Sequence, residues 1–171
     1  MSNIKTIRVL GRNPCSLNDG EGSRDVWYIA NCTHFCQGCH SEKYWYDNGQ
    51  EFNIQKVIDK MKENPITDIT ISGGDGLTIQ YKNTLELLKQ IKKQTNKNVW
   101  LYTGYTFDEL INSNKKECLK HIDVLVDSRF EIDKRDITLK FKGSSNQRII
   151  DVQESLKQNK IIKYNFNKII K

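Results

Sequence analysis

Residues 67–91, which read TDITISGGDGLTIQYKNTLELLKQI, decide the fold class of this chain. Residues 67–72 alternate apolar and polar side chains as a strand does, and they run into a glycine turn, GGDG, at residues 73–76. The apolar side chains that follow have the spacing of an amphipathic helix; they are Leu85, Leu87, Leu88 and Ile91. A strand, a turn and a helix in this order predict a βα unit.

The same pattern recurs along the chain. The other predicted strands are residues 25–31 (DVWYIAN), 98–103 (NVWLYT), 122–126 (IDVLV) and 148–152 (RIIDV), and the other predicted helices are residues 54–61, with Asn53 as N-cap, and 106–112. Alternating units predict an α/β fold with a parallel sheet. A closed eight-stranded barrel needs about 250 residues. We therefore expect an open partial barrel of about five to six mainly parallel strands.

Length and composition indicate one folded domain. The chain has 171 residues, of which 37% are hydrophobic and 28% charged, with a mean hydropathy of -0.66. We expect a single domain over residues 1–171, with a core at about 18–152 and a C-terminal tail at about 153–171 that frays beyond Asn159. No membrane span and no secretory signal are evident, so we expect a cytoplasmic protein. In that reducing compartment the five cysteines favour metal or thiol chemistry over disulfides.

The net charge of +6 is concentrated late in the chain. The basic residues concerned are Lys134, Arg135, Lys140, Lys142, Lys157, Lys160, Lys163, Lys168 and Lys171. Such a surplus attracts nucleic acid, phosphorylated ligands or acidic proteins. These side chains are dispersed rather than consecutive, so we interpret them as a solvated surface and expect no nucleic-acid partner.

Three cysteines follow the first predicted strand. Residues 32–40 read CTHFCQGCH and place Cys32, Cys36 and Cys39 close together. Thiolates are soft ligands that suit an iron–sulfur cluster or zinc. Three thiolates on a four-iron cluster leave one iron open to a substrate. The spacing favours such a cluster, while a zinc site with His34, His40 or His121 as fourth ligand stays an alternative.

The C-x-x-x-C-x-x-C spacing resembles that of the radical S-adenosylmethionine superfamily, and the glycine turn with its acidic third residue is similar to that superfamily's turn. A narrower resemblance, to the activating enzymes of anaerobic ribonucleotide reductase, covers nearly the whole chain. The segments that carry it are residues 18–24 (NDGEGSR), the cysteine segment with Trp45, residues 100–105 (WLYTGY), 123–127 (DVLVD) and 141–148 (FKGSSNQR).

The resemblance implies a radical-SAM type of fold and roles for individual residues. Cys32, Cys36 and Cys39 would hold a [4Fe–4S] cluster and act as the catalytic centre. The residues expected to bind S-adenosylmethionine are Gly38, Cys39 and His40 at the adenine or ribose, Gly73, Gly74 and Asp75 at the methionine end, and Tyr102, Thr103 and Asp127 at later strand ends. For Asn146, Gln147 and Arg148 we expect a structural or partner-facing role.

The resemblance also implies a reaction. A flavodoxin or ferredoxin would reduce the cluster, S-adenosylmethionine would be cleaved to a 5′-deoxyadenosyl radical, and that radical would generate a glycyl radical on the large reductase subunit. Two alternatives remain open. One is another radical enzyme, such as a different glycyl-radical activase or a deazaguanine-type synthase, and the other is a zinc-binding interaction or nucleic-acid module.

Two residues depart from the pattern of the resembling family. Gly76 stands where proline is usual, which would loosen the turn. Ser128 stands where glycine is usual, and a positive φ there would cost about 1 kcal/mol.

Several other cysteine, tryptophan and histidine residues are expected to have no direct part in the chemistry. Cys15 and Cys118 are expected to be ordinary thiols, Trp27 and Trp100 core residues, and His121 a capping or surface residue. His34 is expected either to tune the cluster or to face solvent.

Overall fold

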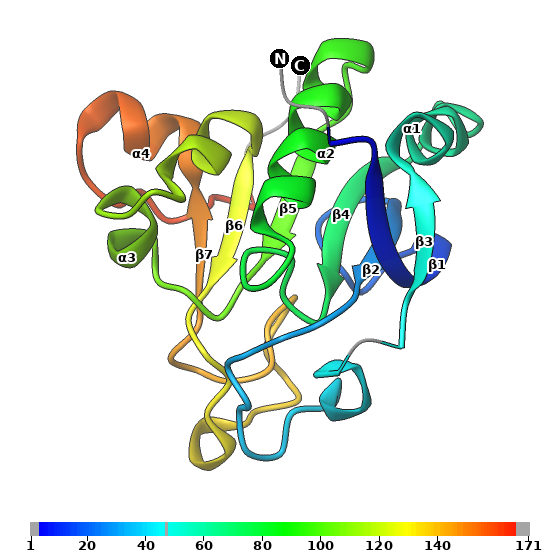
Figure 1. The fold of residues 1–171 in the computed structure, drawn as a ribbon. Helices are drawn as coiled ribbons and strands as arrows, with labels where there is room; N and C mark the ends of the chain where they lie inside the picture. Colours follow the sequence, from blue (N-terminus) through cyan, green and yellow to red (C-terminus); the bar gives the residue numbers. More distant parts are fainter. Residues whose placement is uncertain (1–3, 47, 167–171) are drawn as a thin grey trace.

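The computed structural model describes residues 4–46 and 48–166 as an α/β fold built on one sheet (Figure 1). Its strands lie in the order β3-β1-β2-β4-β5-β6-β7. Their bounds are β1 (Thr6–Ser16), β2 (Arg24–Ile29), β3 (Gln50–Asn53), β4 (Asp68–Gly73), β5 (Val99–Tyr102), β6 (Val124–Asp127) and β7 (Arg148–Asp151). The sheet is open, with β3 and β7 at its edges, so the expected partial barrel is not confirmed.

The prediction of about five to six mainly parallel strands is wrong. In the described ranges the sheet has seven strands, and its central pairs β2–β4, β4–β5 and β5–β6 are parallel. The pairs β1–β2, β1–β3 and β6–β7 are antiparallel. The sequence predicts the parallel centre because its strands alternate with helices. β1 was missed because two register shifts and the residues Gly11, Asn13 and Pro14 break its alternation.

The helices cover one face of this sheet (Figure 1). They are α1 (Ile54–Lys62), α2 (Tyr81–Gln94), α3 (Phe107–Ile111) and α4 (Val152–Gln158). Short 3₁₀ helices occur in the connections at Glu42–Tyr44, Lys116–His121 and Ile132–Lys134. Asn53 caps α1 as predicted, accepting hydrogen bonds from the backbone N–H groups of Gln55 and Lys56. Thr106 and Glu109 form a capping box that starts α3.

The main core lies between these helices and every second residue of the strands. Ile69 and Ile71 of β4 and Leu101 of β5 face α2, whose Leu87 and Leu88 are fully buried. Trp27 belongs to the same core, as expected. Burial of apolar surface in this core supplies the main driving force for folding, at roughly 25 cal/mol per Å².

The opposite face carries a smaller aromatic core. Trp100, which the sequence predicted to be buried, packs there with Val124 and Val126. Tyr164 lies with its ring centroid 5.3 Å from that of Trp100. Its hydroxyl donates a hydrogen bond of 2.5 Å to Glu21. Residues from the C-terminal part of the chain therefore close this face.

The prediction that the chain frays beyond Asn159 is wrong for residues 160–166. The backbone N–H of Asp151 donates to the carbonyl of Ile162 at 2.9 Å, and that of Tyr164 donates to the carbonyl of Ile149 at 2.8 Å. These bonds hold the segment along β7. Lys168 and Lys171 lie outside the described residues.

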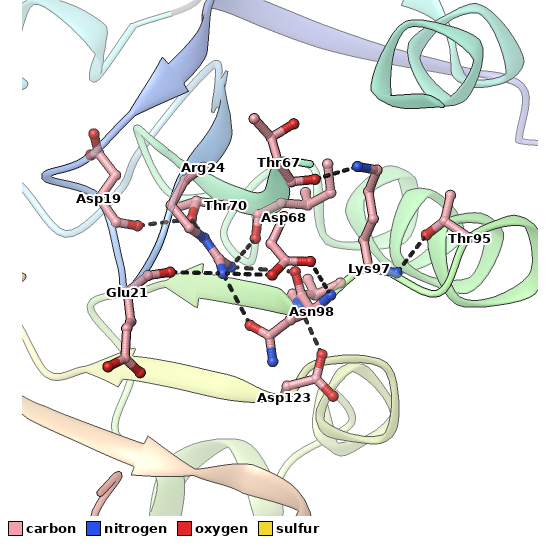
Figure 2. Close-up of polar contacts among 12 residues, drawn as sticks. Asp19, Glu21, Arg24, Thr67, Asp68, Thr70, Thr95, Lys97, Asn98 and Asp123 are labelled. Atoms are coloured by element: carbon pink, nitrogen blue, oxygen red, sulfur yellow. Dashed lines mark hydrogen bonds and ion pairs between the residues drawn. The ribbon is translucent and has the colours of Figure 1, made fainter. Parts of the chain in front are cut away.

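A buried arginine organises the amino ends of the central strands. Arg24, 1% exposed, donates hydrogen bonds to Thr70 Oγ1 at 3.0 Å and to Asn98 Oδ1 at 3.1 Å (Figure 2). It also lies over the Trp100 ring, and Thr70 in turn donates to the carbonyl of Asp19. Residues 18–24 thus form a plug at the amino end of the sheet, away from the cysteines.

The carboxyl ends of β2, β4, β5 and β6 meet at the opposite end of the sheet. There the segments after β2 and after β6 form the loops at the bottom of Figure 1. In an α/β sheet this is the end at which ligands bind. None of the helices in residues 4–46 and 48–166 is long and apolar enough to cross a bilayer.

Candidate functional site

The cysteine loop, residues 32–40, starts three residues after Ile29, the last residue of β2. The backbone N–H of Cys32 donates to the carbonyl of Trp45, and that of Cys39 donates to the carbonyl of Cys36, each at 3.1 Å. These bonds fold the loop back on itself. Cys32 is buried, whereas Cys36 and Cys39 are half-exposed.

All three thiols line one pocket with a volume of about 140 Å³. Its walls come from the cysteine loop, the glycine turn, the end of β5 and the loop after β6. The lining residues are Cys32, His34, Cys36, Cys39, His40, Ser41, Ser72, Gly73, Gly74, Asp75, Tyr102, Thr103, Gly104, Ser128, Phe130, Gly143 and Gln147.

The glycine turn is fastened to the start of the cysteine loop by the backbone. The N–H of Gly74 donates to the carbonyl of Ile29 at 2.9 Å, and that of Asp75 donates to the carbonyl of Asn31 at 2.7 Å. Gly73 has a φ of +106°, and a Cβ on it would come within 2.6 Å of the Ile29 nitrogen. Glycine is required here because the turn packs directly against the backbone at the end of β2.

Thr103 extends the site to β5. Its hydroxyl donates a hydrogen bond of 2.7 Å to Asp75 Oδ2, and its backbone N–H donates to the carbonyl of Val126 on β6. His34 reaches the same carboxylate, with Nε2 2.8 Å from Asp75 Oδ2. Its side chain is 5% exposed, so of the two roles considered for it, the solvent-facing one is wrong.

Burial dominates the electrostatics of Cys32 and Cys36. Desolvation raises the pKa of Cys32 to about 11, and the neighbouring Cys36 and Cys39 add to the rise. The pKa of Cys36 is also raised, chiefly by burial. Three clustered thiols in a partly desolvated pocket favour a bound cationic group that stabilises their thiolate forms.

The donor set fits an iron–sulfur cluster, for which cysteine thiolates are the usual ligands. Cys32, Cys36 and Cys39 supply three, and the remaining side of the pocket is formed by the glycine turn and by Thr103. In such a cluster each thiolate would bind a different iron, and within residues 4–46 and 48–166 no three His, Cys, Asp or Glu side chains form a group that could hold a single metal ion.

Two of the residues predicted to bind S-adenosylmethionine lie outside the pocket lining. Asp127 is fully buried, and its carboxylate accepts hydrogen bonds from Arg148 Nη2 at 2.5 Å and from the backbone N–H of Phe107 at 2.8 Å. Gly38 has a φ of +73°, and a Cβ on it would come within 2.8 Å of Ile132. The other predicted contacts all line the pocket; they are Cys39, His40, Gly73, Gly74, Asp75, Tyr102 and Thr103.

The loop after β6 supplies pocket residues that the sequence prediction missed. They are Ser128, Phe130, Gly143 and Gln147, together with Ser41, Ser72 and Gly104 from the other walls. Gln147 accepts from the backbone N–H of Gly143 at 2.8 Å and donates to the carbonyl of Ser128 at 3.2 Å, while Asn146 donates to the carbonyl of Arg129 at 2.9 Å. The GSSNQR segment was the available signal, and it folds this loop onto the site.

The remaining candidates lie away from the pocket. Cys15 is exposed on β1, and Cys118 is buried beneath α2 and α3. His121 Nε2 lies 3.6 Å from a Glu117 carboxylate oxygen, and burial lowers its pKa. Of the three histidines considered as a fourth zinc ligand, His34 is engaged by Asp75 and His121 does not line the pocket, which leaves His40.

Comparison with known proteins gives consistent matches. A family model described as "4Fe-4S single cluster domain" matches residues 18–150. The chain is 34% identical over 142 residues to the anaerobic ribonucleoside-triphosphate reductase-activating protein of Haemophilus influenzae, which covers 78% of this chain and 91% of that protein. It is 35% identical over 144 residues to the protein of that name from Escherichia coli K12, covering 78% and 92%. The protein of that name from Enterobacteria phage T4 is 32% identical over 144 residues, covering 80% and 88%.

Proposed function

The chain belongs to the family of anaerobic ribonucleoside-triphosphate reductase-activating proteins, and we propose that it activates such a reductase by radical chemistry on S-adenosylmethionine. In this proposal a [4Fe–4S] cluster is held by Cys32, Cys36 and Cys39. The match to a single-cluster iron–sulfur domain over residues 18–150 supports the cluster.

One observation carries the proposal. The three thiols share a single pocket with the glycine turn and with Thr103, which come from the ends of two further parallel strands. A metal site alone needs only the thiols. The adjoining turn offers backbone groups to a small zwitterionic ligand, as the amino-acid part of S-adenosylmethionine requires.

The chain's own residues would hold and shield the reactants. When bound, the cluster supplies the single electron that splits a carbon–sulfur bond of S-adenosylmethionine and so yields a 5′-deoxyadenosyl radical. Gly73 and Gly74 would orient the methionine end through their backbone, and the Gly38–His40 backbone would lie along the adenine or ribose. Cys32, 8% exposed, lies where little water reaches.

Asp127 is given a supporting role in this proposal. Its carboxylate is held by Arg148 and by the backbone N–H of Phe107, so it joins β6, β7 and the start of α3 behind the pocket.

The proposed partners follow from the family. The product would be a glycyl radical on the large reductase subunit, whose backbone glycine loses one hydrogen atom to the 5′-deoxyadenosyl radical. The electron would come from a reduced flavodoxin or ferredoxin. We place the reaction in the cytoplasm, where such donors stay reduced.

Anaerobic purification of the full chain tests the proposal. We expect a brown protein with about four irons per chain that, with a reductant, S-adenosylmethionine and the large reductase subunit, gives a glycyl doublet in electron paramagnetic resonance. Cys36→Ser should abolish the doublet and lower the iron content.

Cys15→Ser is the matched control because Cys15 is an exposed thiol outside the pocket, and this variant should keep both iron and doublet. A colourless protein with tightly held zinc would refute the cluster. Cleavage of S-adenosylmethionine without a doublet would refute the reductase as the partner.

A further inference from the structure

Among the non-cysteine residues of the cysteine loop, only His34 has a buried side chain. Its Nε2 donates to Asp75 Oδ2 at 2.8 Å, and its ring packs edge-to-face on Tyr105 with 4.7 Å between centroids. Its side chain is 5% exposed, although residues on either side of it, Thr33 and Phe35, are exposed. Between its first two cysteines, the loop is therefore held to the rest of the protein by the His34 side chain.

The Asp75 carboxylate, which contacts His34, already accepts hydrogen bonds from four donors of the protein. Asp75 Oδ2 accepts from His34, from the Thr103 hydroxyl at 2.7 Å and from the Gly104 backbone N–H at 2.9 Å. Asp75 Oδ1 accepts from the backbone N–H of Leu77 at 2.8 Å. The residue is 2% exposed. A carboxylate with four donors at these distances has little remaining capacity for a ligand.

The residues around the His34 imidazole leave a space that fits the ring. A Cβ on Gly104 would overlap the ring, lying 2.7 Å from Cγ of His34 and closer still to Cδ2. The absence of a side chain at residue 104 thus makes the space that His34 fills. Tyr105 closes the other side, so the ring is held by a hydrogen bond, a ring contact and a steric fit.

We infer that His34 and Asp75 form a latch that holds the cysteine loop against the ends of β4 and β5, and that Asp75 acts as a positioning residue instead of binding the ligand's ammonium group. The inference rests on the proposed function only for the identity of what the loop binds. The ligand's ammonium group would then be met by backbone carbonyls of the glycine turn, whose shape the Asp75 carboxylate maintains.

Thiol labelling of the full chain, stripped of metal by a chelator, tests the latch without reference to activity. Cys32 is buried at the start of the loop, Cys15 is exposed, and Cys118 is buried in the helix-side core, so the last two serve as internal references. Iodoacetamide labelling, resolved by site with mass spectrometry, should be about tenfold faster at Cys32 in His34→Phe and in Asp75→Asn, because a buried hydrogen bond to a charged group is lost.

The references and a double variant make the result decisive. Labelling of Cys15 and Cys118 should not change, since a general loss of folding would expose Cys118 as well. The double variant His34→Phe with Asp75→Asn should be no faster at Cys32 than either single variant, because one interaction is broken in all three. His121→Gln is the matched histidine control and should leave all rates unchanged.

A second readout separates positioning from a purely structural role. In the iron-loaded protein, His34→Phe should weaken S-adenosylmethionine binding about tenfold and alter the electron paramagnetic resonance of the reduced cluster. His34→Gln, which can still donate to Asp75, should restore most of both properties.

Two results would overturn the latch. One is unchanged Cys32 labelling in His34→Phe while Cys118 stays protected. The other is Asp75→Asn with normal iron content and a protected Cys32 but weak ligand binding, which would make Asp75 a direct ligand contact. If the wild-type protein binds no iron, the proposed function fails, whereas the labelling experiment still reports on the latch.

Discussion

Ser128 has a φ of +79°, a left-handed backbone conformation that serine adopts at a cost of about 1 kcal/mol. The positive φ anticipated at this position is therefore present. Its hydroxyl offsets part of that cost by donating to Asp127 Oδ1 at 3.2 Å. We expect Ser128→Gly to stay within about 1 kcal/mol of wild type, since relief of strain opposes the lost bond and the added chain entropy.

Ser128→Ala is the matched comparison because it removes the hydroxyl and keeps the strained φ. It should be the least stable of the three proteins in urea unfolding. An alanine variant as stable as the glycine variant would show that φ does not limit stability at this residue.

Cys118 is a buried thiol that makes stability depend on alkaline pH. Burial raises the pKa of Cys118 from 9.0 to about 12, so the unfolded chain loses this proton first as pH rises. Stability contributed by the protonated thiol is complete below the unfolded pKa and is lost progressively above it. From about pH 8 to about pH 10 we expect wild type to lose roughly 1 kcal/mol more than Cys118→Val.

Urea unfolding at both pH values measures this difference, and the comparison with Cys118→Val cancels other groups that titrate in the same range. Cys15→Val serves as the control, because Cys15 is exposed and its variant should keep the wild-type pH dependence. Equal losses in wild type and Cys118→Val would contradict the prediction.

At the scale of elements, the glycine turn packs directly against Thr84 of α2. A Cβ on Gly76 would lie 2.6 Å from Thr84 Oγ1 and 3.1 Å from Thr84 Cγ2. Thr84 is buried in α2, and its hydroxyl has no hydrogen-bond partner in the described structure. The Thr84 side chain thus occupies the space that a side chain at residue 76 would need, which limits the looseness expected of this turn.

Gly76→Ala should cost about 1–3 kcal/mol in wild type and close to nothing in a Thr84→Ala background, because the overlap is then removed. Urea unfolding of the four proteins gives the coupling energy directly. Gly11→Ala is a suitable control, since its Cβ would lie 3.9 Å from the nearest atom, in Tyr28. A cost that is the same in both backgrounds would refute the proposed fit.

The elements differ in how far the sequence predicted them. The strands β2, β4, β5, β6 and β7 and the helices α1, α2 and α3 were predicted because each has a recognisable apolar pattern. β3 has only four residues with none buried, so neither its length nor its burial gives a pattern. Antiparallel pairing at the two edges depends on contacts between distant segments, which local periodicity does not report.

The candidate site divides in the same way. The cysteines were predicted from their spacing and from the affinity of thiolates for soft metals. The glycine turn and Thr103 were predicted from the resemblance, supported by their position after strands whose carboxyl ends reach one edge of the sheet. Phe130 and Gly143 lie in an irregular loop with no period, and their place at the pocket depends on hydrogen bonds from Asn146 and Gln147 back to the chain after β6. The burial of His34 required knowledge of Asp75 and Gly104, which lie far away in sequence.

At the scale of the whole molecule, the two ends of the parallel strands have different tasks. The carboxyl ends carry the pocket, and the amino ends carry the Arg24 plug (Figure 2). Burial lowers the pKa of Arg24 to about 10, yet the residue stays charged at neutral pH and is satisfied by carbonyls and side chains around it.

The C-terminal segment covers the aromatic face and contacts the plug at the amino end of the sheet. Tyr164 packs on Trp100 from one side, and its hydroxyl binds Glu21 of the plug. If the segment belongs to the cooperative unit, truncating Tyr164 opens a cavity over the buried Trp100 and removes the bond to Glu21. We expect Tyr164→Ala to destabilise the protein by about 2–3 kcal/mol in urea unfolding.

Phe166→Ala is the control that separates this effect from a general loss of aromatic surface. Phe166 is 38% exposed and contacts Tyr164 and Phe141 at the rim, so its truncation should cost about 1 kcal/mol or less. Tyr164→Phe keeps the packing and loses only the hydroxyl, and it should fall between the two. Were Tyr164→Ala no more destabilising than Phe166→Ala, residues 160–166 would be an appendage on a sheet that is stable without them.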